Sequence, residues 1–290
     1  MSRRMNILVV NDDGVEALGV HKLAEALAEV GDIYVCAPPS QQSATGHGIT
    51  IGRPIYAKDA PFREAKRAIV MEGTPADCVK IGLEAYRDSG VEMDMVFSGF
   101  NHGMNLGTDT LYSGTVSAAI EGAICGLPSA ALSISTRFSN HTTPYHFDTA
   151  MKVAQRIARS ELFLERAREG PESPDINFIN KEHVILTVNI PDLPAEEIKG
   201  VKVCPLSYRL YDDWFRTQAD DEGSVGYYYS GMPHFVGDAN ADDSDIIANE
   251  LNYVTVTPLH FDLTDRRRLP ALREAWNGSI EDFIKKQGSY

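Results

Sequence analysis

Met5-Asn-Ile-Leu-Val-Val-Asn-Asp-Asp-Gly14 is the stretch that decides the fold. Its apolar residues, Ile7 to Val10, run directly into a polar turn, which is typical of a buried strand ending at the edge of a parallel sheet. Leu18–Val30 follows with apolar residues at helical spacing, and Asp32–Ala37 is strand-like again before two prolines. This strand–helix–strand order predicts an α/β core.

The alternation of strands and helices continues along the chain. A helix is predicted to begin at Thr74-Pro75, because threonine suits the N-cap and proline suits the first turn. The other predicted elements are strand Asp94–Phe97, helix Val116–Ile124, strand Ala130–Ile134, helix Phe147–Arg168 and strand His183–Asn189. We therefore expect a mostly parallel, doubly wound sheet with helices on both faces.

The composition changes after Pro191. Lys202–Gly237 is rich in Tyr, Asp, Gly and Trp without a helical period, which predicts strands or hairpins that project from the core. Tyr253–Pro258 alternates as a strand does, and a terminal helix is expected from Leu269 through Phe283. The expected organisation is a core over residues 1–200, a β-rich extension over 201–265 that returns to the core, and a C-terminal helix over 266–290.

Composition and charge exclude several classes of protein. The 290 residues carry 27 Lys and Arg against 41 Asp and Glu, a net charge of −14, which disfavours duplex nucleic acid as a partner. No apolar run is long enough for a membrane helix, and the basic start leads into too short an apolar run for a signal peptide, so a cytoplasmic location is expected. The cysteines (Cys36, Cys78, Cys125 and Cys204) form no C-x-x-C pair and are predicted to be buried thiols.

Asp12 and Asp13 directly follow the first predicted strand. Ligands of open α/β sheets bind outside the carboxyl ends of strands, which is where this pair falls. Two adjacent carboxylates repel each other unless a cation or solvent screens them, and hard oxygen ligands suit Mg²⁺ or Mn²⁺. The alternative is a solvated turn, since Asn-Asp-Asp-Gly is also good turn chemistry.

Three further polar segments are candidates for ligand binding. Ser98–Gly107 follows a strand and is rich in Gly and Asn, so Asn101 and Asn105 are expected to offer amide contacts; a long turn is the alternative. Ser113-Gly114-Thr115 opens a helix and predicts an anion site, or a simple helix cap. Ser40–Gly48 contains Ser43 as a candidate metal ligand, or is only a polar turn.

Motifs of competing functions are missing from the sequence. The first strand is not followed by G-x-G-x-x-G, and there is no G-x-x-x-x-G-K-[ST], so dinucleotide and ATP cradles are disfavoured. No G-x-S-x-G elbow marks an α/β-hydrolase serine. His47 and His102 have no H-x-x-x-H or H-E-x-x-H spacing, which disfavours zinc.

The combination of these segments resembles the SurE (survival protein E) family of 5′/3′-nucleotidases. The resemblance spans nearly the whole chain. It is carried by the stretches Ile7–Gly14, Ala37-Pro38 with Gln42–Gly46, Gly73–Asp77, Ser98–Asp109, Tyr112–Val116 with Glu121-Gly122, and Val256–Thr264. It departs from the family at Asp220–Gly226, where a more basic stretch is expected, so substrate preference and assembly are the properties that this departure affects.

The resemblance implies a role for each segment. It implies that one divalent metal is held by Asp12, Asp13, Ser43 and Asn101. It implies that the phosphate side is lined by Asn105, Ser113, Gly114 and Thr115. Asp262, in the last of the matching stretches, is a further candidate for an active-site residue. The implied fold is a Rossmann-like core whose C-terminal extension is exchanged between the subunits of a homodimer or homotetramer.

The expected function is that of a metal-dependent phosphomonoesterase acting on nucleoside 5′-monophosphates, and on 3′-monophosphates as a possible second class. The residues expected to act in catalysis are Asp12, Asp13, Asn105 and Ser113, with Mg²⁺ or Mn²⁺ as the cofactor. Attack on phosphorus by water and attack by an aspartate both remain open. The alternatives are a hydrolase of polyphosphate or another phosphoester, and a non-catalytic protein that binds a phosphorylated metabolite.

Overall fold

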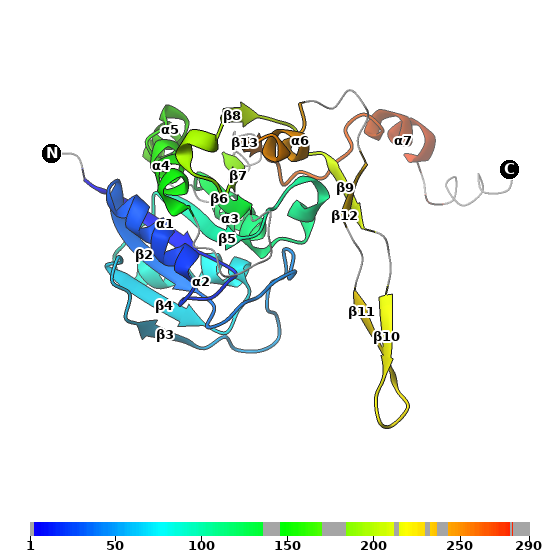
Figure 1. The fold of residues 1–290 in the computed structure, drawn as a ribbon, viewed down its shortest axis with the longest axis horizontal. Coiled ribbons are helices and arrows are strands. Elements are labelled where there is room, and N and C mark those ends of the chain that lie inside the picture. The colour runs from blue at the N-terminus through cyan, green and yellow to red at the C-terminus, as the bar shows by residue number, and fades with distance from the viewer. Residues whose placement is uncertain are drawn as a thin grey trace, which may run out of the picture. The chain divides into compact units, whose positions relative to one another are not determined.

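Strand β1 (Met5–Val10) lies near the middle of a sheet with the order β3-β4-β2-β1-β5-β6-β7-β13-β8 (Figure 1). The computed structural model describes residues 3–135, 146–169, 184–211, 215–229, 233–236, 243–278 and 280. The chain divides into one unit over Met1–Leu259 and a second over His260–Tyr290, and each is described by itself.

The sheet of the first unit is mostly parallel, which confirms the predicted α/β fold. Only β3 with β4 and β13 with β7 pair antiparallel in it, among the strands that the structure describes. Its other strands are β2 (Gly31–Ala37), β3 (Ala57–Ala60), β4 (Arg67–Met71), β5 (Met95–His102), β6 (Ser129–Ser135), β7 (Ile185–Pro191), β8 (Gly200–Val203) and β13 (Tyr253–Pro258). The helices are α1 (Leu18–Ala28), α2 (Pro75–Asp88), α3 (Gly114–Ile124), α4 (Phe147–Ala158), α5 (Glu161–Glu169) and α6 (Asp245–Glu250), with short 3₁₀ turns η1 (Gly107–Leu111) and η3 (Ala195–Glu197).

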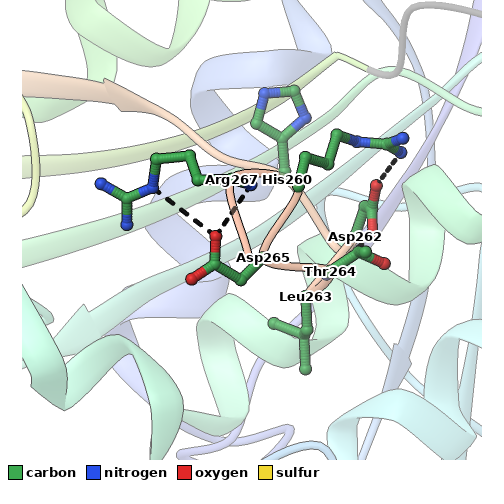
Figure 2. A pocket seen from close by; sticks show the side chains of 7 residues that line it. His260, Asp262, Leu263, Thr264, Asp265 and Arg267 are labelled. Carbon is green, nitrogen blue, oxygen red and sulfur yellow. Dashed lines mark hydrogen bonds and ion pairs between the residues drawn. The ribbon is translucent and has the colours of Figure 1, made fainter. Parts of the chain in front are cut away.

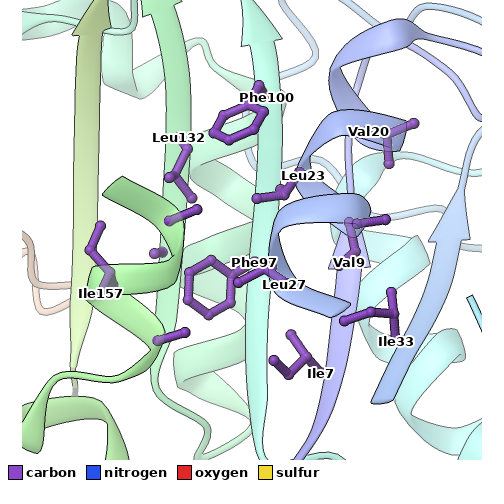
Figure 3. Close-up of a cluster of buried hydrophobic side chains, with 14 of the residues drawn as sticks. Ile7, Val9, Val20, Leu23, Leu27, Ile33, Phe97, Phe100, Leu132 and Ile157 are labelled. Carbon is purple, nitrogen blue, oxygen red and sulfur yellow. The ribbon is translucent and has the colours of Figure 1, made fainter. Parts of the chain in front are cut away.

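Helices cover both faces of the sheet. Successive side chains of β1 point to opposite faces, so each face buries a different set of them. Ile7 and Val9 pack into a cluster with residues of α1, α4 and α5, part of which Figure 3 shows. Leu8 and Val10 pack into a second cluster with residues of α2 and α3. The continuous apolar run of β1 is therefore explained by burial on both faces.

The predicted start of the second helix is confirmed. Thr74 is the N-cap of α2, and its hydroxyl accepts a hydrogen bond from the Asp77 backbone N–H at 3.1 Å. The Asp77 carboxylate in turn accepts from the Thr74 backbone N–H at 2.9 Å. This reciprocal capping box fixes where the helix begins.

The single helix predicted over Phe147–Arg168 is wrong, because the chain forms α4 and α5 with a break at Ser160. The Ser160 hydroxyl donates to the Ile157 carbonyl at 2.6 Å, and its own carbonyl accepts from the Phe163 N–H at 3.1 Å. A serine that bonds the local backbone in this way ends one helix and starts another.

The second unit contains α7 (Leu269–Trp276). The predicted terminal helix begins where expected, and α7 ends at Trp276, where Asn277 has an extended backbone; the predicted end at Phe283 falls outside the described residues. Residues 281–290 lie outside the described residues.

The Lys202–Gly237 segment contains strands, as predicted. Strand β9 (Tyr208–Tyr211) pairs antiparallel with β12 (Pro233–Val236), and β10 (Phe215–Ala219) pairs antiparallel with β11 (Val225–Tyr229). These two ribbons are the yellow strands of Figure 1. We call residues 204–237 the arm.

Two smaller predictions concern thiols and membranes. Cys36, Cys78 and Cys204 are buried free thiols, as predicted, whereas Cys125 is only partly buried. Among the described helices, none combines the length and the apolar character that crossing a bilayer requires.

Candidate active site

The carboxyl ends of β2, β1 and β5 lie next to one another, because these three strands are adjacent and parallel. The polar segments that follow them therefore meet at one edge of the sheet, as the topology of open α/β sheets requires of a ligand site. Asp12 and Asp13 follow β1, and the Ser40–Gly48 loop follows β2. Asn101 is the second-to-last residue of β5, which runs through His102 and so extends beyond the strand predicted to end at Phe97.

Asp12 is buried against the start of α3. Its side chain is held by Thr115, whose hydroxyl donates to Oδ1 at 2.5 Å and whose backbone N–H donates to Oδ2 at 3.1 Å. Burial raises the pKa of Asp12 to about 6, with the neighbouring Asp13 adding to the rise and the bonds from Thr115 opposing it. A carboxylate in this setting gains from any nearby cation.

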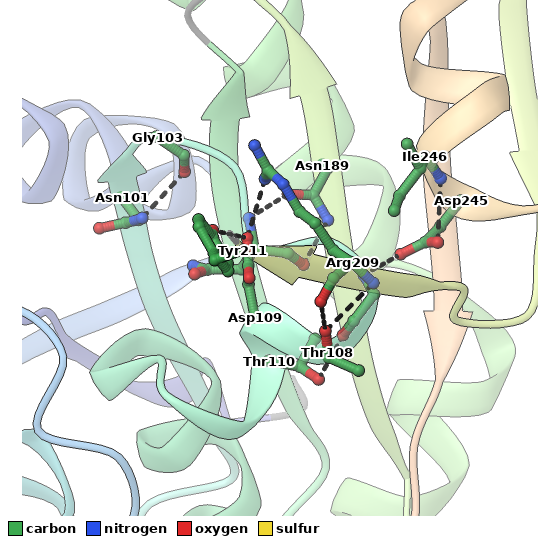
Figure 4. Close-up of polar contacts among 12 residues, drawn as sticks. Asn101, Gly103, Thr108, Asp109, Thr110, Asn189, Arg209, Tyr211, Asp245 and Ile246 are labelled. Carbon is green, nitrogen blue, oxygen red and sulfur yellow. Dashed lines mark hydrogen bonds and ion pairs between the residues drawn. The ribbon is translucent and has the colours of Figure 1, made fainter. Parts of the chain in front are cut away.

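Asp13 connects the end of β1 to the end of β5. Its Oδ2 accepts the backbone N–H of His102 at 3.1 Å, and its Oδ1 is 3.4 Å from the Gln41 amide nitrogen. Asn101, the neighbour of His102, donates from Nδ2 to the Gly103 carbonyl at 2.9 Å, which leaves its amide oxygen facing the opposite way (Figure 4). The structure therefore brings Asp13 next to the chain segment of Asn101.

Ser43 sits at the exposed tip of the loop after β2. The neighbouring Gln42 donates its backbone N–H to the Asp12 carbonyl at 2.7 Å, so the loop is joined to the acidic pair one residue away from Ser43.

Glu121 anchors that same loop, and sequence reasoning missed its role. Its carboxylate is buried in α3 and is 2.8 Å from His47 Nε2 and 2.7 Å from Lys80 Nζ. Burial raises the pKa of Glu121, but the hydrogen bonds from His47 and Lys80 outweigh it, so the pKa lies below its usual value. The pairing of Glu121 with His47 spans 74 residues of sequence, and no local pattern signals it.

Asn105 lies on the β6–β7 side of the site. Its backbone N–H donates to Asn189 Oδ1 at 2.8 Å, and its Nδ2 donates to Ser133 Oγ at 2.9 Å. Asn189 returns a bond from its own Nδ2 to the Asn105 carbonyl at 3.0 Å. These buried contacts fix the orientation of the Asn105 amide.

Ser113, Gly114 and Thr115 form the start of α3. Ser113 is the N-cap, and its hydroxyl oxygen accepts the Val116 N–H at 3.1 Å. A β-carbon added at Gly114 would lie 2.9 Å from both Cβ and Oδ2 of Asp12. The helix therefore begins in contact with the acidic pair, which the sequence had not shown.

Asp262 belongs to the second unit. Its Oδ1 accepts the Thr264 N–H at 2.9 Å and it pairs with Arg266; these hydrogen bonds lower the pKa of Asp262 to about 2. It lines an open pocket of about 520 Å³ (Figure 2). The residues of that pocket all come from the second unit, namely His260, Asp262, Leu263, Thr264, Asp265, Arg266 and Arg267.

The donor chemistry around the acidic pair fits a hard divalent cation. Asp12, Asp13, Ser43 and Asn101 each have a side-chain oxygen that can coordinate a metal, and the raised pKa of Asp12 reflects unfavourable ionisation that a cation relieves. In the described part of the chain, no three His, Cys, Asp or Glu side chains gather as a metal site. The expected ligand set contains two residues of these types, Asp12 and Asp13. That the set binds a metal stays a prediction.

Fold and site together define the class: a mostly parallel α/β protein whose polar loops meet at the carboxyl edge of the sheet. The family model for survival protein SurE matches residues 7–213. A 5′-nucleotidase SurE of Petrotoga mobilis is 43% identical over 261 residues, which cover 90% of this chain and 94% of the relative. That of Carboxydothermus hydrogenoformans is 41% identical over 97% of this chain and 99% of the relative.

A solved structure agrees with these relatives. The crystal structure of the SurE protein from Aquifex aeolicus is 34% identical, covers 93% of this chain and 99% of its own, and superposes with a TM-score of 0.69. The chain belongs to the SurE family.

Proposed function

We propose that this protein is a metal-dependent 5′-nucleotidase that hydrolyses nucleoside 5′-monophosphates to nucleoside and phosphate. Phosphatase activity on nucleotides is the function of the 5′-nucleotidase SurE relatives, which align with this chain over nearly its full length. The proposal also includes dependence on a divalent cation and activity on nucleoside 3′-monophosphates.

The observation that carries the proposal is the contact between Asp12 and the start of α3. A carboxylate pair placed beside a helix N-terminus puts a cation site next to a site for anions. A phosphate monoester needs both, because its charge must be compensated while phosphorus is attacked. A protein that only bound anions would gain nothing from two carboxylates next to its ligand.

Asp12, Asp13, Ser43 and Asn101 would hold the cation, and Mg²⁺ or Mn²⁺ suits their oxygen atoms. When bound, a divalent ion neutralises charge on the phosphoryl group and lowers the pKa of water. Thr115 holds the Asp12 carboxylate in place through its hydroxyl and its N–H.

The phosphate side is formed by Asn105 and the α3 start. Asn105 uses one N–H of its amide on Ser133, and the second N–H can donate to a phosphate oxygen. The hydroxyl of Ser113, which accepts from Val116, still has its own hydrogen to donate. These donors orient the phosphoryl group for in-line displacement of the nucleoside.

A substrate panel tests the function. Nucleoside 5′- and 3′-monophosphates, polyphosphate and p-nitrophenyl phosphate are assayed with Mg²⁺, Mn²⁺ and Co²⁺, and again with EDTA. We expect release of phosphate from 5′-monophosphates that EDTA abolishes and added metal restores. Turnover of polyphosphate alone would favour the other hydrolase, and binding of nucleotide without turnover would show a non-catalytic binder.

A further inference from the structure

The short helix η1 connects the two parts of the proposed phosphate site, which are Asn105 and the start of α3. Asn105 lies two residues before Gly107, where η1 begins, and Ser113 lies two residues after Leu111, where it ends. The position of η1 therefore sets the spacing between the Asn105 amide and the N-cap of α3.

The backbones of η1 and the arm approach each other closely at Gly107. Its φ is +54°, and a β-carbon there would lie 2.7 Å from the Ser207 carbonyl oxygen. The buried carboxylate of Asp245 bridges the two segments, since it accepts the Gly107 N–H at 2.7 Å and the Ser207 N–H at 2.9 Å. This junction fixes where the arm leaves the core.

Strand β9 of the arm makes hydrogen bonds to Thr108 and Asp109, the two residues of η1 that follow Gly107 (Figure 4). The Thr108 hydroxyl donates to the Arg209 carbonyl and accepts the Arg209 N–H at 3.2 Å. Asp109 Oδ2 accepts from Arg209 Nη1 at 2.8 Å and from the Tyr211 hydroxyl at 2.9 Å.

The ion pair of Asp109 with Arg209 is shielded from water. The side chain of Asp109 is 13% exposed and that of Arg209 is 19% exposed, so solvent screens the pair less than it screens a surface pair. The other oxygen of Asp109, Oδ1, is buried and has no hydrogen-bond partner among the residues that the structure describes. A carboxylate that leaves one oxygen unsatisfied depends strongly on the donors that its second oxygen has, and both of these come from β9.

We infer that β9 is part of the phosphate-binding apparatus, with Asp109 as a positioning residue that locks η1 to the arm and so sets Asn105 and Ser113 at the spacing of a phosphate group. The inference rests on the proposed function. It assigns to the first strand of the arm a role inside its own chain, separate from any contact with another subunit.

The test uses Asp109→Asn with Asp94→Asn as a matched control. Asp94 has a similarly buried side chain, 9% exposed, and pairs at 2.7 Å with Arg3, which is 60% exposed; it lies before β5, at the opposite end of that strand from Asn101. Both variants lose one carboxylate–arginine pair, so a merely structural role predicts the same behaviour for both.

We expect Asp109→Asn to raise the inhibition constant for inorganic phosphate and the KM for the nucleotide by about fivefold to tenfold, which is comparable to the net effect of losing one ordinary hydrogen bond. The metal activation constant should stay within about twofold, because the acidic pair is not touched. Asp94→Asn should leave all three constants near wild type. Equal phosphate constants in the two variants would overturn the inference.

A second variant and a binding measurement cover the other outcomes. Tyr211→Phe keeps the ring and removes one hydrogen-bond donor to Asp109, so we expect a smaller rise in the inhibition constant for phosphate. This variant tests the inference even if Asp109→Asn does not fold. An unchanged inhibition constant counts against the inference. If the wild type fails to hydrolyse nucleotides, the proposed function fails. Calorimetric titration of inorganic phosphate, with Mg²⁺ present, then tests the inference alone: weaker binding to Asp109→Asn supports it and equal binding overturns it.

Discussion

Asp12 is a carboxyl group that the fold has made costly to ionise. Its pKa is about 6 in the folded chain against 3.8 for an ordinary aspartate. A raised pKa means that the folded state is favoured by protonation: the contribution to stability is complete below pH 3.8 and is lost as the pH rises through about 6. The metal-free protein at neutral pH therefore carries an electrostatic penalty at this residue.

Replacing Asp12 with Asn should abolish nucleotidase activity and stabilise the metal-free fold. The shift corresponds to about 2–3 kcal/mol at pH 7.5, because the amide cannot ionise and can still accept the Thr115 N–H. Urea unfolding with EDTA at pH 7.5 and at pH 5 measures this, and the gain should shrink at the lower pH. Asp94→Asn, which breaks the pair with Arg3, should instead destabilise.

A variant of Asp12 or Asp13 to Asn that kept near wild-type turnover at saturating metal would contradict the cation site. A variant of Asp12 that was less stable than wild type under EDTA would show that the hydrogen bonds from Thr115 outweigh the cost of burial.

The same carboxyl group makes metal activation sensitive to acid. A proton and a cation compete for Asp12, so the metal activation constant should rise as the pH falls through about 6 and be roughly tenfold higher at pH 5 than at pH 7.5. Activity titrated with Mg²⁺ at each pH measures this constant, and circular dichroism confirms that the chain stays folded. A constant that did not change between pH 7.5 and pH 5 would place the cation away from Asp12.

Sequence reasoning located the acidic pair and the Asn101 segment because strand ends and turn residues are local signals. It could not locate Glu121, since its contact with His47 exists only when α3 packs beside the loop after β2. It also assigned Thr115 to phosphate, whereas both donors of Thr115 meet Asp12 in the structure. Distance along the chain hides such contacts.

At the scale of elements, helix α3 offers a direct test of the phosphate side. Ser113→Ala should raise the inhibition constant of inorganic phosphate by roughly tenfold or more, since a hydroxyl bond to a charged partner is lost. It should also lower the melting temperature slightly, because the Val116 N–H loses its cap. Steady-state inhibition by phosphate and thermal unfolding measure the two effects.

Ser117→Ala is the control within the same helix. Its hydroxyl donates to the Ser113 carbonyl at 2.6 Å, one turn further along, so it shares the stability effect but not the contact with phosphate. If both variants lower stability and neither changes phosphate inhibition, Ser113 acts only as a helix cap.

Several elements with strong local signals were predicted closely, whereas β4, with its buried apolar run, was not predicted. β1 and Tyr253–Pro258 match the expected strands, and the Thr74 cap fixed the start of α2. Strand β3 was missed because Ala57–Ala60 is mostly exposed and polar at the sheet edge. The break between α4 and α5 depends on how Ser160 bonds the backbone, which an apolar period does not report.

At the scale of the molecule, the arm predicts a homodimer or a larger symmetric assembly through exchange between subunits. Tyr208, Phe215, Tyr227 and Tyr228 are more than half exposed in this chain, and apolar surface of this kind is favoured at interfaces. Trp214 and the side chain of Tyr229 lie outside the described residues.

Analytical ultracentrifugation at micromolar concentration tests the exchange. The intact protein should sediment as a dimer or larger, and a variant in which a Gly-Gly link replaces Phe215–Tyr229 should lose assembly while the sheet stays folded. This deletion keeps β9 and its bonds to η1, so loss of assembly is separated from loss of phosphate binding. An intact protein that is monomeric would refute the exchange.

The place of β13 in the sheet has a consequence for how the chain is made. The strands β1 to β7 are complete once residue 191 has left the ribosome, but β8 pairs only with β13 among the described strands. β13 follows about fifty residues later, after the whole arm, and must enter between β7 and β8. Until then the backbone N–H and C=O groups of β8 that pair with β13 in the folded chain have no strand partner, so nascent chains stalled inside the arm should be the ones that a chaperone captures.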